Sequence, residues 1–216
     1  LAAGKIAMKY FRGKFTMRLK APRNIVTQAD VECEQAVKRI ISNAFPSHSF
    51  IGEEEGAQGR TGEVWHIDPI DGTTNFAHGL EYFCTSIGFV KNGWVVCGAV
   101  YQPALKKMFY ASKGGGAFLN GKKIHVSAVS RLEDALLISG FPYDNSRLEE
   151  KTFASMKSLV GKCHDIRRFG SAALDFCAVA EGSCEAFFEY SLHSWDVAAG
   201  LLIVEEAGGA VTDING

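Results

Sequence analysis

Apolar positions between residues 31 and 45 recur with the spacing of an amphipathic helix. The apolar side of that helix is formed by Val31, Ala36, Val37, Ile40, Ile41 and Ala44. Asp30 is placed to cap the helix, and Pro46 ends it. We expect a short strand over Ser49–Ile51 and then a polar, Gly-rich loop over residues 53–62.

The middle of the chain contains apolar segments of strand length. They cover residues 63–68, 84–90, 94–101 and 108–111. Asn92-Gly93 predicts a tight hairpin turn between the second and the third. Residues 116–123 approach the spacing of a P-loop, but Lys123 stands where Ser or Thr is needed. We therefore interpret this segment as a Gly-rich hairpin, followed by a strand over Ile124–Val126.

The second half alternates between strand and helix patterns. Strands are predicted over residues 135–139, 166–169 and 184–188, and helices over residues 147–160, 172–180 and 195–207. A further strand is expected to begin over Ala210–Thr212. This alternation, with an antiparallel stretch before it, predicts an α/β (α+β) fold in which helices and mixed sheet form stacked layers.

Composition and charge narrow the classes of protein. With 47% hydrophobic and 22% charged residues, the chain is typical of a globular domain. The 23 basic and 24 acidic residues leave a net charge of -1, which excludes a broad electrostatic attraction to nucleic acid or an anionic membrane. The six cysteines form no C-x-x-C pair and the chain has no N-x-[ST] sequon, so we expect a reducing, cytoplasmic location.

The strongest candidate for chemistry is the segment Trp65–Phe76. An apolar strand delivers Asp68 at its end, Pro69 is expected to fix a turn, and Asp71 follows just before Gly72. A short helix beginning at Gly72 would point unpaired amides outward, which suits a phosphate. Two carboxylates beside those amides suit a phosphate only with cations between them, and Mg²⁺ prefers such oxygen ligands. The alternative is a capping role for Asp71 and a solvent-facing Asp68.

Three further acids occupy comparable places. Glu53 follows a strand, Asp196 opens an apolar helix behind Ser194, a credible cap, and Asp30 precedes the first full helix. Each acid has a plain structural alternative: a solvated acidic loop for Glu53, a favourable charge in the first helical turn for Asp196, and a cap for Asp30.

Three stretches agree in order and spacing with one group of phosphatases. They are Gly52-Glu53-Glu54, Asp68-Pro69-Ile70-Asp71-Gly72-Thr73-Thr74-Asn75-Phe76, and Trp195-Asp196 running into Ala198-Ala199-Gly200 and Glu205-Glu206-Ala207-Gly208-Gly209. Over nearly the whole chain the sequence resembles the inositol monophosphatase family of Mg²⁺-dependent, lithium-sensitive phosphatases, and among them the bacterial type of inositol-1-monophosphatase. The resemblance implies a layered α-β-α-β-α sandwich, as in inositol monophosphatase and fructose-1,6-bisphosphatase, with a metal site between two sheet regions.

By this resemblance, four carboxylates and one carbonyl would hold two or three Mg²⁺ ions. Glu53, Asp68 and the carbonyl of Ile70 would hold the first ion. Asp68, Asp71 and Asp196 would hold the second, and Glu53 would reach a third through waters. Without metal, clustered carboxylates repel one another, so their pKa values should rise.

The resemblance also implies catalytic roles for Asp30, Thr73 and Glu53. Asp30 would accept a hydrogen bond from the Thr73 hydroxyl, which in turn would orient the attacking water. The amides of Gly72 and Thr73 would hold the phosphate. No covalent phosphoenzyme is implied.

For the alcohol part of the substrate, the resemblance points to Asp71, Gly170, Ser171, Ala172, Glu189 and Asp196. Better-known members of the family have Thr in place of Ser171. From the residues alone, Glu189 is equally well explained as a solvent-facing acid at the end of a strand.

The leading functional hypothesis is hydrolysis of a phosphorylated polyol, myo-inositol monophosphate. A second hypothesis keeps the metal site and changes the substrate to fructose 1,6-bisphosphate, a 3'-phosphoadenosine phosphate, histidinol phosphate or NADP. A third, of another class, is a regulatory protein that binds a protein partner or an RNA-containing complex.

The expected organisation is a single phosphatase domain over residues 1–216. Its N-terminal α+β half, about residues 1–130, would carry most metal ligands, and its α/β half would cover residues 131–216. The chain stops at Asn215-Gly216 soon after a predicted strand begins, where family members continue, so we expect it to be truncated there. The resemblance implies a homodimer. No membrane partner and no direct binding of nucleic acid are expected.

Overall fold

The structure, a computed structural model, describes residues 1–142, 146–213 and 216. The helices are α1 (Ala2–Tyr10), α2 (Gln28–Ala44), α3 (Thr73–Ala77), α4 (Ser146–Leu159), α5 (Ala172–Ala180) and α6 (Ser194–Glu206), with a 3-10 turn at Leu132–Asp134. None of the helices in these ranges combines the length and the apolar character that crossing a bilayer requires.

A large mixed sheet forms the second layer of the molecule. Its strands lie in the order β10-β9-β8-β7-β6-β5-β3-β4, and all neighbours are antiparallel except β3 and β5, which are parallel. The strands are β3 (Ser49–Gly52), β4 (Gly56–Gln58), β5 (Glu63–Asp71), β6 (Cys84–Lys91), β7 (Trp94–Gln102), β8 (Lys107–Ser112), β9 (Gly116–Leu119) and β10 (Lys122–Lys123). The predicted hairpins at Asn92-Gly93 and within residues 116–123 are both present.

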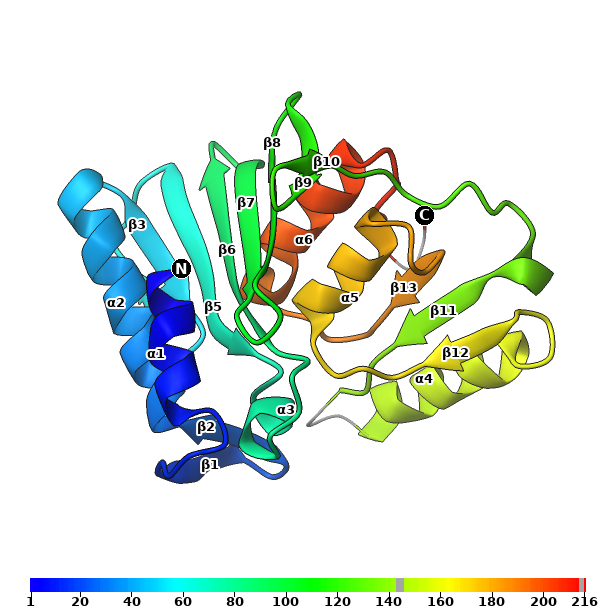
Figure 1. Ribbon diagram of the computed structural model, residues 1–216, viewed down its shortest axis with the longest axis horizontal. Helices are drawn as coiled ribbons and strands as arrows, with labels where there is room; N and C mark the ends of the chain where they lie inside the picture. The colour runs from blue at the N-terminus through cyan, green and yellow to red at the C-terminus, as the bar shows by residue number, and fades with distance from the viewer. Residues whose placement is uncertain (143–145, 214–215) are drawn as a thin grey trace.

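A small parallel sheet forms the fourth layer, in the order β12-β11-β13. Its strands are β11 (Leu136–Ser139), β12 (Asp165–Arg167) and β13 (Ala186–Phe188). Figure 1 shows α1 and α2 outside the large sheet, α5 and α6 between the sheets, and α4 outside the small sheet. This arrangement confirms the predicted α-β-α-β-α sandwich. A separate hairpin, β1 (Met17–Ala21) with β2 (Asn24–Thr27), lies below α2.

Two apolar clusters hold the layers together. One packs α1 and α2 against the large sheet through Val37, Phe50, Ile67 and other buried side chains. The other packs α5 and α6 against the opposite face. There α6 lies very close to the sheet, because a Cβ added to Gly88 or Gly98 would come within 2.9 Å of Ala198 or Ala199 atoms. Small residues at this crossing let the helix that carries Asp196 rest directly on the sheet.

Several local predictions were wrong at the ends of elements. Pro69 does not fix a turn: β5 continues through it to Asp71, with a break in register against β6 between Asp68 and Asp71. A proline has no amide to donate, so a strand accepts it at such a bulge. The predicted strands at Ile124–Val126 and Ala210–Thr212 are not strands. The predicted loop at residues 53–62 includes the short strand β4. Asn215 lies outside the described residues.

Replacing Gly88 with Ala tests the close packing of α6. The new methyl would stand 2.6 Å from the Cβ of Ala198 and 2.9 Å from the backbone nitrogen of Ala199, so helix and sheet must separate. We expect a loss of about 1–3 kcal/mol in the free energy of unfolding, measured by urea denaturation. A variant as stable as the parent would contradict this contact.

Candidate active site

Except for Asp30, the predicted acids line one small cavity of about 120 Å³. Glu53 reaches it from the turn between β3 and β4, Asp68 and Asp71 from the end of β5, and Asp196 from the start of α6. The lining also includes Ile70, Gly72, Thr73, Thr74, Glu189 and His193. Segments separated by more than a hundred residues therefore supply carboxylates to the same space.

Asp68 is the most isolated of these acids. Its side chain is buried, and its Oδ1 is the one buried side-chain oxygen or nitrogen of the described residues without a hydrogen-bond partner. Burial raises its pKa well above the usual range, and the neighbouring carboxylates of Glu53, Asp71 and Asp196 raise it further. A buried oxygen left without a donor is costly, and a bound cation would satisfy it.

The unpartnered oxygen of Asp68 is the observation that indicates a metal site. The described ranges contain no group of three or more His, Cys, Asp or Glu side chains already placed to hold an ion. The donor set around the cavity nevertheless consists of carboxylate oxygens, which are the ligands that Mg²⁺ prefers. The residues present therefore fit a hard divalent cation.

Asp71 is held by the start of α5. Its Oδ2 accepts hydrogen bonds from the Ser171 hydroxyl and from the amide of Ala173, both at 2.6 Å. Burial raises the pKa of Asp71 to about 6, although these donors favour the charged form and lower it. Ser171 is also the N-cap of α5 and accepts a bond from the amide of Leu174. One hydroxyl thus joins the helix start to the carboxylate.

Asp196 lies in the first turn of α6, where its Oδ2 accepts the amide hydrogen of His193 at 2.6 Å. Burial raises the pKa of Asp196 to about 8, with a further contribution from the charge of Asp71. The N-cap is His193 rather than the expected Ser194. The Ser194 hydroxyl instead lies 2.9 Å from Nδ1 of His66, which ties α6 to β5.

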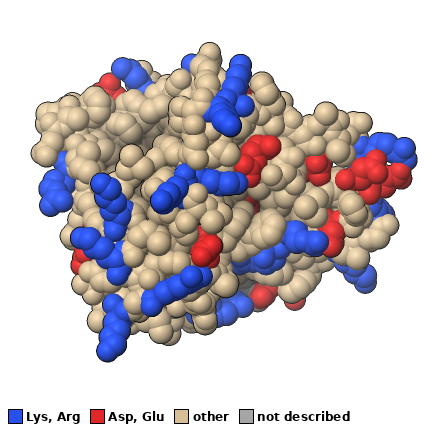
Figure 2. Space-filling model, viewed as in Figure 1, with Lys and Arg blue, Asp and Glu red and all other residues tan. Residues whose placement is uncertain are grey.

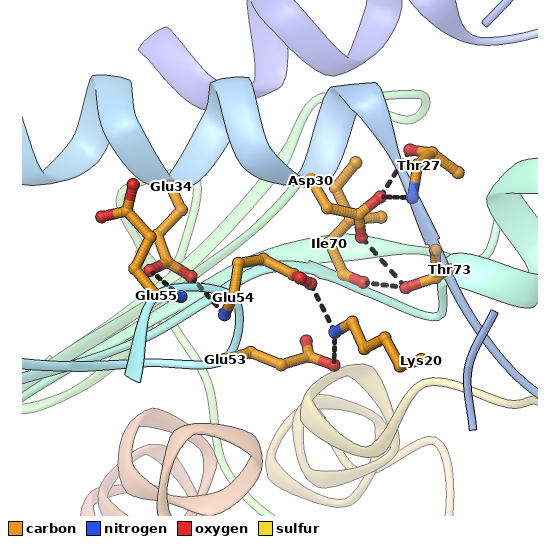
Figure 3. A network of polar contacts seen from close by, with 9 residues as sticks. All are labelled: Lys20, Thr27, Asp30, Glu34, Glu53, Glu54, Glu55, Ile70 and Thr73. Atoms are coloured by element: carbon orange, nitrogen blue, oxygen red, sulfur yellow. Dashed lines mark hydrogen bonds and ion pairs between the residues drawn. The ribbon is translucent and has the colours of Figure 1, made fainter. Parts of the chain in front are cut away.

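Asp30 and Thr73 make the predicted contact. Oγ1 of Thr73 lies 3.1 Å from Oδ1 of Asp30 and 2.9 Å from the carbonyl oxygen of Ile70 (Figure 3). The prediction that Asp30 caps α2 was wrong. Thr27 is the N-cap, and Asp30, three residues on, accepts its amide hydrogen at 2.8 Å. Burial raises the pKa of Asp30 to about 6.

Lys20 is the residue that the sequence analysis missed. It projects from the β1–β2 hairpin, and its Nζ lies 2.8 Å from Oε1 of Glu53 and 2.5 Å from Oε1 of Glu54 (Figure 3). Burial lowers the pKa of this ammonium, but the two carboxylates outweigh burial and raise it. No pattern marks Lys20, because hairpin and acidic turn are distant in the sequence.

The predicted alcohol-binding residues divide into three groups. Asp71, Glu189 and Asp196 line the cavity together with Gly72 and Thr73. Gly170 lines a neighbouring hollow that also includes Arg168 and Phe153. Ser171 and Ala172 are buried at the start of α5 and line neither space. Burial raises the pKa of Glu189 to about 7.

Comparison with known proteins shows the family to which the chain belongs. The profile described as "Inositol monophosphatase family" matches residues 1–216. The chain belongs to the inositol monophosphatase family. Membership identifies it as a phosphoric monoester hydrolase, and members of the family generally depend on a metal ion, Mg²⁺.

Relatives in this family cover most of the chain. A protein of Pasteurella multocida named "Nus factor SuhB" is 41% identical over 99% of this chain and 82% of its own length. An "Inositol-1-monophosphatase" of Rhizobium meliloti is 40% identical over 92% of this chain and 75% of its own. The crystal structure of the extragenic suppressor protein SuhB of Bartonella henselae superposes with a TM-score of 0.92 at 36% identity, over 96% of this chain and 81% of that one.

The raised pKa values predict how pH affects the metal-free protein. Asp30, Asp71 and Asp196 have folded-state pKa values of about 6, 6 and 8, against a usual 3.8. The folded protein therefore keeps protons that the unfolded chain has released. These groups consequently lower the free energy of unfolding as the pH rises from about 4 to about 8.

The variant Asp196→Asn isolates one of these groups, because its amide oxygen still accepts the His193 hydrogen. With excess chelator, it should melt at a higher temperature than the parent at pH 8.5 and at the same temperature near pH 4. Added Mg²⁺ should raise the melting temperature of the parent more than that of the variant. A variant that melts no higher than the parent at pH 8.5 would contradict the inference that the charged form of Asp196 destabilises the metal-free protein.

Proposed function

We propose that this protein hydrolyses a small phosphorylated polyol, myo-inositol monophosphate, to inositol and inorganic phosphate with two or three Mg²⁺ ions bound. The observation that carries the proposal is the buried, unpartnered Oδ1 of Asp68, with three more carboxylates around the same cavity. The best use of such oxygens in a phosphatase is to hold metal ions against a substrate phosphate.

In this proposal the ligands are those implied by the family. Glu53, Asp68 and the carbonyl of Ile70 hold one ion, and Asp68, Asp71 and Asp196 hold a second, with Glu53 near a third. When bound, Mg²⁺ supplies Lewis-acid activation of water and neutralises phosphate charge. The anchors described above support these roles, because Asp71 and Asp196 are each fixed through Oδ2 by donors from the protein.

The chain's own residues position the water and the phosphate. The Thr73 hydroxyl has one hydrogen; when it donates to Oδ1 of Asp30, its oxygen is left to accept from the attacking water. Asp30, with its raised pKa, is suited to hold the proton that the water loses. The amides of Gly72 and Thr73 bind phosphate oxygens. The water oxygen bonds to phosphorus and the ester bond breaks, and the leaving alkoxide takes a proton from solvent in exchange for the proton that Asp30 later releases.

The polyol would lie toward Glu189 in the lining of the cavity. Glu189 lies so close to Gly140 that a Cβ there would overlap the Glu189 carboxyl. A carboxylate in the lining of the cavity can accept hydrogen bonds from substrate hydroxyls. By the family resemblance, Gly170, Ser171 and Ala172 would contribute to the same binding region.

The setting of the proposed enzyme follows from its surface and thiols. All six cysteines lie in the described ranges and are free, which supports a reducing cytoplasm. Charges of both signs are scattered over the face in Figure 2, without a continuous basic area.

We infer one phosphatase domain over residues 1–216, since α6 packs on the sheet of the first half. The family resemblance supports a homodimer.

Replacing Asp71 with Asn tests the proposed chemistry. The amide removes the charge of one ligand of the second ion and keeps an oxygen for Ser171 and Ala173, so the fold should survive. We expect phosphate release from myo-inositol monophosphate to fall by several orders of magnitude. The parent should need Mg²⁺, and the exposed Asp165→Asn should be fully active. Hydrolysis by the parent in excess chelator would refute the mechanism.

The variant Glu189→Gln tests the proposed polyol contact. Loss of the charge should change the relative kcat/KM among a panel of phosphate esters more than it changes kcat for any one of them. The panel includes inositol monophosphate, fructose 1,6-bisphosphate, a 3'-phosphoadenosine phosphate, histidinol phosphate and NADP. The exposed Glu205→Gln is the control. An equal loss across the panel would assign Glu189 to stability instead of selection.

The same panel decides between inositol phosphate and the other substrates of this fold. A regulatory role is favoured by one observation, the name Nus factor carried by a relative at 41% identity. An Asp71→Asn variant that loses hydrolysis and retains its function in the cell would support binding of a partner. Loss of both would support catalysis as the function.

A further inference from the structure

A buried carboxylate on α2 binds the backbone of the turn that carries Glu53. Glu34 is fully buried. Its Oε2 accepts the amide hydrogen of Glu54 at 2.8 Å, and its Oε1 accepts that of Glu55 at 3.1 Å. Figure 3 shows this carboxylate directed at the backbone of the turn, while the Glu53 side chain extends away from it toward Lys20.

The close approach of the turn to this carboxylate leaves no spare room. A Cβ added to Gly52 would stand 2.2 to 2.8 Å from the three carboxyl atoms of Glu34. The residue before Glu53 therefore has to be Gly if the contact is to exist. On the other side, the amide of Glu53 donates to the carbonyl oxygen of Ile67 at 3.1 Å. The turn is thus fixed between α2 and β5.

A buried partner balances the charge of Glu34. Nζ of Lys38, one helical turn further on, lies 2.7 Å from Oε1 of Glu34 and 3.1 Å from Oε2 of Glu55. The Lys38 side chain is 8% exposed. Buried ion pairs often add little net stability, since both charges lose their hydration. The geometry that this pair imposes on the turn is therefore its more informative property.

We infer that Glu34 is a positioning residue: its carboxylate, paired with Lys38, fixes the backbone of residues 53–55 so that Glu53 faces the metal-binding cavity. The inference rests on the proposed role of Glu53 as a metal ligand. Neither Glu34 nor Lys38 lines the cavity. Removing a group that orients a metal ligand in this way commonly lowers the metal affinity about 10–100-fold.

The variant Glu34→Gln keeps the shape of the side chain and replaces one acceptor oxygen with a donor. In the metal-free protein, hydrogen exchange of the Glu54 and Glu55 amides should become at least about 10-fold faster. The apparent affinity for Mg²⁺, measured by titration calorimetry, should fall about 10–100-fold. At saturating Mg²⁺, kcat and KM should return to within a few-fold of the parent.

Two further variants separate positioning from general stability. Glu32→Gln makes the same change on the outer side of α2, where Glu32 contacts Tyr10, and should leave Mg²⁺ affinity unchanged. The double variant Glu34→Gln/Lys38→Met removes the unpaired ammonium and keeps the protein folded if the single variant fails. If the pair serves stability alone, the double variant binds Mg²⁺ as the parent does, which overturns the inference. If Glu34 positions the turn, the affinity of the double variant for Mg²⁺ stays low.

These measurements distinguish failure of the inference from failure of the proposed function. A parent that binds no Mg²⁺ and hydrolyses no ester refutes the function, and the exchange rates of Glu54 and Glu55 still report on the contact. A parent that needs Mg²⁺, together with a Glu34→Gln variant of unchanged exchange and unchanged affinity, refutes the positioning role alone.

Discussion

The structure is organised around the repulsion among carboxylates that share one small, partly buried space. Burial disfavours their charged forms, and each charge disfavours the others, so the pKa values of Asp68, Asp71 and Asp196 all rise. Lys20 contacts Glu53 and Glu54 at the edge of the site, and the charge of Arg168 lowers the pKa of Glu189. The fold must therefore hold the acids in place against an electrostatic force that would separate them.

The ends of helices provide much of that restraint. The first turn of α5 donates to Asp71, and the amide that precedes α6 donates to Asp196. The capping interaction at the start of α2 fixes Asp30. Unpaired amides at helix starts favour a negative charge and partly offset the effect of burial. Donors at the starts of α5 and α6 thus fix two carboxylates of the cavity, and α6 lies directly against Gly88 and Gly98 of the sheet.

Local sequence rules succeeded where local forces decide. The α2 pattern, the Asn92-Gly93 hairpin and the alternating second half all follow from side-chain spacing and turn chemistry, which act over a few residues. They failed where a distant contact competes. Ser194 has the chemistry of a cap, but its hydroxyl contacts His66, and His193 takes the cap position. Pro69 looks like the end of a strand, yet pairing with β6 resumes at Asp71.

The sequence alone determined which residues could carry the chemistry: the acids Glu53, Asp68, Asp71 and Asp196, their order along the chain, and the family that uses this order. Only the tertiary structure decided how those acids are held. The support of the Glu53 turn by Glu34 and the bond from Ser171 to Asp71 join residues that are 20 and 100 positions apart, and Oδ1 of Asp68 has no hydrogen-bond partner. Such contacts depend on how layers pack in three dimensions, and no periodicity or spacing along one chain encodes that packing.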